Sequence, residues 1–209
     1  MQMRRIHQAA LVFLIAEILA GCGASRPVKY YVLDASPSPA SASSAQLPIT
    51  LLVSHITASH LYRDDRLVFG TGPVQLGTYE YERWAESPAE MMQDLLIASL
   101  RDTGNYRSVS RISSNLRGDY FVRGRLGALD EVESPALAAR FSFELELFDP
   151  KTGVTTWSGS YTHDEPVTGK KVSDVVEALN RNVHTGLTQL SANLGQYFAS
   201  RPPSPSATR

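Results

Sequence analysis

The 209-residue sequence contains a single cysteine, Cys22, so it can form neither an internal disulfide nor a metal site with several cysteine ligands. It also has no excess of positive charge. The formal net charge is −1, and it becomes −2 if Arg4, Arg5 and Glu17 are removed with residues 1–21. Proteins that bind nucleic acid use clustered Lys and Arg to neutralise phosphates, so no nucleic-acid partner is expected.

Motifs of the common enzyme classes are missing as well. The sequence has no G-x-S-x-G elbow, no P-loop and no G-x-G-x-x-G, and its histidines show no ligand spacing. His163-Asp164-Glu165 could touch a metal, but a solvated strand end is the simpler interpretation. Ser158 and Ser160 fit a strand, and Asp64 and Asp65 fit a charged turn. We therefore predict a protein that is not an enzyme, with no metal site and no cofactor.

What the sequence does have is a lipoprotein signal at its start. A pair of arginines precedes an apolar stretch, Ala9 to Ala20, which is too short to span a bilayer. The stretch ends in Leu19-Ala20-Gly21-Cys22, which resembles the lipobox of bacterial lipoproteins. That resemblance implies cleavage between Gly21 and Cys22 and attachment of acyl chains such as palmitate to Cys22. The alternative is an ordinary secretory signal with an incidental cysteine.

The residue after the cysteine bears on the destination of the protein. It is Gly23 rather than Asp, and resemblance to enterobacterial lipoproteins then implies sorting to the outer membrane, on its periplasmic face. Two or more acyl chains make a stable anchor, because each buried CH₂ contributes about 0.8 kcal/mol. The expected covalent lipid on Cys22 is thus the only non-protein group that the sequence predicts.

The mature chain divides into three parts by composition. Residues 22–48 are expected to hold the lipidated tether, a short strand at 29–33 and a Ser/Pro/Ala-rich flexible linker at 36–48. Residues 49–201 are expected to form one periplasmic domain, followed by a disordered tail at 202–209.

Alternation and capping patterns predict the elements of this domain. Ser87 and Pro88 can begin a helix that Gly104 ends, and Ser173 can cap a long last helix. The apolar stripe of that last helix, from Val172 to Phe198, is expected to pack in the core rather than line a lipid groove. The expected strands are residues 49–56, 66–69, 74–81, 106–109, 120–129, 137–148 and 155–162. This order predicts an α+β fold with a mostly antiparallel sheet and two helices packed on one face.

Three aromatic residues near the first helix are candidates for a partner interface. Tyr79, Tyr81 and Trp84 recur along one expected strand and its end. Aromatic residues are enriched at interfaces, but they line cores at least as often, so both interpretations stay open.

The same region carries a family resemblance. The stretch Tyr79-Glu80-Tyr81-Glu82-Arg83-Trp84-Ala85-Glu86-Ser87-Pro88, followed by Gly104-Asn105-Tyr106, resembles the ABC-type transport auxiliary lipoproteins. Tyr30-Tyr31-Val32-Leu33, the Phe-rich strand at 141–148 and the Trp157 strand fit that family too. Its best-known branch is the lipoprotein component of Pqi-type intermembrane transport systems.

This resemblance implies an auxiliary docking component of an intermembrane lipid transport system. The implied partners are a mammalian-cell-entry (MCE) domain tunnel protein and its ABC permease and ATPase, and the chain is expected to form a homo-oligomer that matches a ring. Two alternatives stay open: a periplasmic carrier with a lipid cavity between sheet and helices, and a structural envelope-assembly lipoprotein without a transport role.

Overall fold

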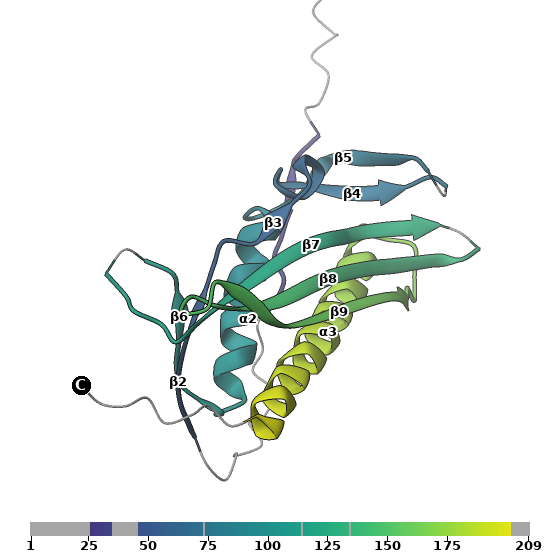
Figure 1. Cartoon of the computed structure of the whole chain (residues 1–209). Coiled ribbons are helices and arrows are strands. Elements are labelled where there is room, and N and C mark those ends of the chain that lie inside the picture. The colour runs from purple at the N-terminus through teal and green to yellow at the C-terminus, as the bar shows by residue number, and fades with distance from the viewer. Residues whose placement is uncertain (1–25, 35–45, 73, 114, 134, 202–209) are drawn as a thin grey trace, which may run out of the picture.

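The computed structural model describes residues 26–34, 46–72, 74–113, 115–133 and 135–201. The predicted signal peptide, Cys22, the tail and residues 36–45 of the predicted linker lie outside this part. The described chain forms a nine-stranded sheet, two α-helices and one 3₁₀ turn (Figure 1). In chain order they are β1 (Lys29–Tyr31), β2 (Leu47–Val53), β3 (Thr57–Ala58), η1 (His60–Tyr62), β4 (Arg66–Gly70), β5 (Leu76–Trp84), α2 (Pro88–Asp102), β6 (Tyr106–Arg111), β7 (Tyr120–Glu133), β8 (Leu137–Asp149), β9 (Val154–Pro166) and α3 (Val172–Ser200).

The long strand β7 organises the sheet. Along one edge it pairs in succession with β2, β3 and β4, and along the other it pairs with β8, which in turn pairs with β9. The sheet therefore branches at β7. One branch continues from β2 to β6, and the other continues from β4 through β5 to β1.

The α+β class is confirmed, but the expectation of a mostly antiparallel sheet is wrong. Within the described residues, five of the eight strand pairings are parallel, so the sheet is mixed. The β4–β5, β7–β8 and β8–β9 pairings, each between strands that follow one another in the chain, are antiparallel. The other pairings join strands far apart in the chain, such as Leu51 with Tyr120, and a parallel pair needs such a long crossover.

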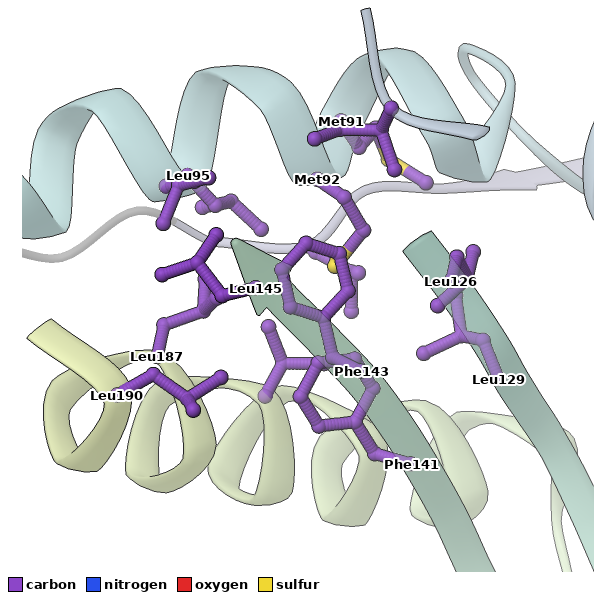
Figure 2. Packing of buried hydrophobic residues seen from close by; sticks show 14 of the residues in the cluster. Met91, Met92, Leu95, Leu126, Leu129, Phe141, Phe143, Leu145, Leu187 and Leu190 are labelled. Atoms are coloured by element: carbon purple, nitrogen blue, oxygen red, sulfur yellow. The ribbon is translucent and has the colours of Figure 1, made fainter. Parts of the chain in front are cut away.

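Strand β8 shows why the sheet has one buried face. Phe141, Phe143, Leu145 and Leu147 alternate with polar residues and are each 0% exposed. Figure 2 shows the first three of these side chains between α2 and α3, beside Leu126 and Leu129 of β7. Residues of both helices and of the sheet thus share one buried cluster.

The first helix begins and ends as its sequence predicts. The Ser87 hydroxyl accepts a hydrogen bond from the backbone N–H of Glu90, with Pro88 in the first turn, and Gly104 follows the helix with a φ of +65°. The start of the last helix differs by two residues from the prediction. Lys171 rather than Ser173 precedes the first turn, and its backbone N–H donates to the Asp174 carboxylate.

Candidate anchoring and docking surface

Residues 26–34, which follow the predicted lipidation site, are held firmly on the domain. In β1, Lys29 and Tyr31 lie beside Glu82 and Trp84 of β5 in a parallel pairing. The two oxygens of the Glu82 carboxylate accept hydrogen bonds from Lys29 Nζ (3.0 Å) and from the Tyr31 hydroxyl (2.7 Å). Burial, and then the contact with Glu82, raises the pKa of Tyr31 to about 12, so its hydroxyl remains a donor at neutral pH.

The end of this segment is fixed by two further contacts. Leu33 is only 7% exposed and belongs to the main buried cluster, and the backbone N–H of Asp34 donates to the Asn180 side chain of α3 at 3.0 Å. The backbone of Tyr31 also accepts a bond from the N–H of Ala85. Residues 29–33, expected to stand before a linker and the main fold, are therefore part of the domain itself, and β2 begins at Leu47 inside the predicted linker range.

The three aromatic candidates do not form one surface. The Tyr79 ring packs against Phe69 at a centroid distance of 4.9 Å, and its hydroxyl donates to Glu131 Oε2 at 2.8 Å. Burial and these neighbouring carboxylates raise the pKa of Tyr79. Tyr79 is half-buried, and its polar tip already has a partner.

Trp84 and Tyr81 have opposite environments. Trp84 is 1% exposed and lies in the core, so its assignment to a partner surface is corrected: its indole packs inside the domain. The Tyr81 ring is half-buried, and the guanidinium of Arg26 lies 5.9 Å from its centroid. A register shift between β4 and β5 separates the pairing of Arg66 from that of Val68, which disturbs the simple alternation that the sequence suggested. The Tyr81 hydroxyl bonds to its chain neighbour Glu80, which raises the pKa of Tyr81, whereas Tyr79 is held by Phe69 and by Glu131 of β7. Tyr81 is therefore better placed than Tyr79 or Trp84 for contact with a partner.

The opposite side of β7, β8 and β9 carries an open polar depression of about 730 Å³. Its charges are already compensated, because Arg140 forms a bidentate pair with Asp164 (2.8 Å for both bonds) and Arg125 pairs with Glu144 at 3.2 Å. Ser142 and Thr162 bond to each other. His163 also lines the depression, and its Nε2 lies 3.5 Å from Glu165 Oε2.

Near this depression one carboxyl group is buried. Asp130 of β7 is 2% exposed and accepts a hydrogen bond from the Tyr62 hydroxyl of η1 at 3.0 Å. Burial raises the pKa of Asp130 to about 6, although the Tyr62 bond and the charge of Arg140 oppose the shift. This hydrogen bond joins η1 to β7 of the sheet, and we expect it to affect the stability of the fold.

The remaining sequence candidates have structural partners. Asp164 forms an ion pair with Arg140, and Glu165 lies within 3.5 Å of both His163 and Arg181. No group of His, Asp and Glu side chains in the described ranges could hold a metal ion. Asp65 pairs with Arg83 at 2.7 Å, which holds the pKa of that carboxyl below its usual value.

No helix among the described elements is long and apolar enough to cross a membrane. Cys22 and Gly21, the predicted lipidation and cleavage residues, lie outside the described residues, so lipidation stays a prediction. Sequence analysis missed the attachment of residues 26–34 to β5. Residues 30–33 are all apolar or aromatic, so their sequence did not show that Tyr31 and Leu33 face inward while Tyr30 and Val32 are exposed.

Comparisons with known proteins agree on the fold. A crystal structure of protein XCC0632 from Xanthomonas campestris is similar with a TM-score of 0.71 at 18% identity, over 83% of this chain and 99% of that one. A crystal structure of an uncharacterised protein has a TM-score of 0.63 at 16% identity with the same coverages. The hypothetical protein CT253 from Chlamydia trachomatis has a TM-score of 0.52 at 9% identity, over 74% of this chain and 99% of that one.

No curated protein matches the sequence. A family model described as the ABC-type transport auxiliary lipoprotein component matches residues 31–192. That match covers most of the chain, from Tyr31 at the end of β1 into the last helix, and includes strands β2 to β9. The chain therefore belongs to the family of ABC-type transport auxiliary lipoproteins.

Proposed function

We propose that the mature protein is anchored by lipid on Cys22 at the periplasmic face of the outer membrane. There it docks the MCE-domain tunnel protein of an ABC-type intermembrane lipid transport system. The observation that carries this proposal is the family match over residues 31–192, in a chain whose first 22 residues end in a lipobox. Outer-membrane sorting is supported by Gly23 in place of Asp.

The packing of the domain favours docking over carriage of a lipid. A carrier would hold an acyl chain between sheet and helices, yet that layer contains large side chains that are almost fully buried. Phe141 and Phe143 of the sheet and Leu187 and Leu190 of α3 are at most 3% exposed and fill the space shown in Figure 2. Interiors packed with such side chains leave few voids larger than a water molecule.

The surface that we assign to docking is centred on Tyr81. Its ring is partly accessible and lies beside Arg26, and Tyr and Arg are the residue types that dominate binding energy at many interfaces. Tyr79 lies two residues earlier but holds its hydroxyl against Glu131, so it supports the surface rather than forming its centre. Self-association into a ring would repeat this surface around the mouth of a tunnel.

The partner is tested by affinity purification of the mature lipoprotein from gently crosslinked envelopes, with identification by mass spectrometry. We expect an MCE-domain protein to be recovered, and Tyr81→Ala to reduce its recovery at least about tenfold, since an anchor residue contributes 1.4 kcal/mol or more. Tyr197→Ala is the matched control, because Tyr197 is also half-buried beside an arginine, with Arg201 at 5.7 Å. Equal recovery with both variants would refute the assigned surface, and recovery of envelope-assembly proteins alone would refute the transport role.

The anchor is tested separately with Cys22→Ser. The wild-type protein should fractionate with the outer membrane and carry acyl mass at its new N-terminus, whereas the variant should carry none. Wild-type protein without acyl mass would contradict lipidation, and acylated protein in the inner-membrane fraction would contradict the proposed sorting. Native mass spectrometry of the detergent-purified protein gives the complementary check, since a co-purified phospholipid would favour the carrier alternative.

A further inference from the structure

We propose that residues Val28, Tyr30 and Val32, called here the β1 stripe, rest on the surface of the bilayer that holds the lipid of Cys22. This inference rests on the proposed lipid anchor and adds to it a fixed orientation of the domain. The occupant of the stripe is a phospholipid surface, and the stripe lies on the side of β1 that faces away from the core.

The stripe is exposed although its residues are apolar or aromatic. Val28 is 40% exposed, and Tyr30 and Val32 are each 64% exposed. The intervening residues point the other way, since Tyr31 bonds to Glu82 and Leu33 is buried in the core. Side chains alternate between the two faces of a strand, so the segment is an amphipathic strand with its apolar outer face uncovered.

Exposed apolar side chains occur in two places along this border of the sheet: on the β1 segment, and at the tip of the β4–β5 hairpin, six to eight residues before Glu82, with which β1 pairs. Eight large hydrophobic residues are exposed in the described part of the chain, and five of them belong to the β1 segment and the β4–β5 hairpin. These five are Val28, Tyr30, Val32, Val74 and Leu76. Figure 1 shows β4 and β5 together at one border of the fold.

Chain length brings this end of the domain to the membrane. Only four peptide steps separate Cys22 from Arg26, where the described chain begins, and four residues span at most about 14 Å. From Arg26 the chain runs directly into β1, which is fixed by the Glu82 contacts and by Leu33. If Cys22 carries the lipid, the tether between the bilayer and the domain is therefore short. The β1 stripe is the first apolar surface of the domain that this tether brings to the bilayer.

The chemistry of the stripe suits a bilayer surface better than a second copy of the chain. Tyrosine is enriched at the membrane–water interface, and valines beside it add apolar area without a long groove. A second copy would have to pair with the edge of β1, but β1 has three residues, follows Pro27 and carries Lys29. Short edges with proline and lysine are the devices by which proteins prevent edge-to-edge pairing.

The test uses the full lipoprotein and its single cysteine. In the mature protein the thiol of Cys22 is consumed by the lipid, so Val32→Cys provides the one free thiol for an environment-sensitive fluorophore. Val154→Cys is the matched control, because Val154 is 54% exposed and lies on β9, on the far side of β7 from β1. Both proteins are reconstituted into phosphatidylethanolamine–phosphatidylglycerol vesicles, with and without spin-labelled phospholipid as quencher.

We expect the fluorescence of the probe at residue 32 to be quenched and shifted to the blue. The quenching should correspond to a depth of about 5–10 Å, as for an apolar face in the headgroup region. The probe at residue 154 should show no quenching and no blue shift. Equal exposure of both probes on vesicle-bound protein would overturn the stripe proposal while leaving the anchor intact. Shielding of residue 32 without lipid quenching, lost on dilution, would overturn it in favour of a second copy. A thiol at Cys22 that reacts with the fluorophore, on protein that does not float with vesicles, would overturn both proposals.

Discussion

The buried carboxyl of Asp130 makes a quantitative prediction about stability. Asp130 is 2% exposed, its carboxylate accepts a hydrogen bond from the Tyr62 hydroxyl at 3.0 Å, and burial raises its pKa from 3.8 to about 6. The variant Asp130→Asn keeps an oxygen that can accept the bond from Tyr62 and removes the charge. We therefore expect this variant to be more stable than wild type at pH 7.5.

The magnitude follows from the shift in pKa. Because the pKa of Asp130 is higher in the folded state, the folded protein binds more protons than the unfolded chain between about pH 3.8 and pH 6. The stability that this extra proton binding by Asp130 contributes is complete below pH 3.8 and is lost as the pH rises through 6. A shift of about two units corresponds to about 3 kcal/mol at one unit per 1.36 kcal/mol, which is about 6–12 °C in melting temperature for a domain of this size.

Urea unfolding followed by circular dichroism, at several pH values from 4 to 7.5, measures this effect. The free-energy difference between Asp130→Asn and wild type should grow by about 2.5 kcal/mol from pH 4 to pH 7.5. Asp164→Asn is the control of opposite sign, since Arg140 lowers the pKa of Asp164 and its stabilising contribution is lost as the pH falls. A difference for Asp130→Asn that does not change with pH would refute the reasoning.

Three further substitutions test the packing that holds the surface in place. Asn182→Ala should lower the free energy of unfolding by about 2–4 kcal/mol in urea titration, because Asn182 bonds to two backbone carbonyls and to the hydroxyl of Tyr161; a loss below 1 kcal/mol would contradict this. Gly186→Ala should cost about 1–3 kcal/mol, since its new Cβ would lie 2.6 Å from the Tyr161 ring, whereas Gly195→Ala, which meets only the end of the Asn105 side chain, should cost less. Equal losses of stability in the Gly186→Ala and Gly195→Ala variants would show that α3 shifts freely to accommodate the new Cβ. Leu33→Ala should release the β1 segment and speed proteolysis after Lys29, and an unchanged cleavage rate would contradict the role given to Leu33.

Local elements were predictable because their signals lie close together in the chain. Ser87, Pro88 and Glu90 specify the start of α2, and the alternation from Phe141 to Leu147 specifies the buried face of β8. Both depend on contacts within a turn or on the pleat of one strand. The resemblance of Leu19–Cys22 to a lipobox is also a local pattern, and lipidation there stays a prediction; the family resemblance is confirmed by the match over residues 31–192.

The sheet topology was not predictable in the same way. Hydropathy shows that Leu51, Leu52 and Val53 are buried, but not that they lie parallel to Tyr120 and its neighbours across a long crossover. The candidate surface failed in part for a more local reason. Trp84 stands three residues after Tyr81 and so breaks the two-residue spacing of Tyr79 and Tyr81; simple alternation already places it on the opposite face of β5, where it is buried beside β1.

The most direct test of the central claim is site-specific photo-crosslinking from residue 81 in living cells. A benzophenone amino acid at position 81 places the reactive group on the proposed docking surface of the lipid-anchored protein. We expect an ultraviolet-dependent adduct with an MCE-domain protein that is absent when the same group stands at position 197. Adducts only with envelope-assembly proteins, or none at position 81 in correctly lipidated protein, would contradict this claim.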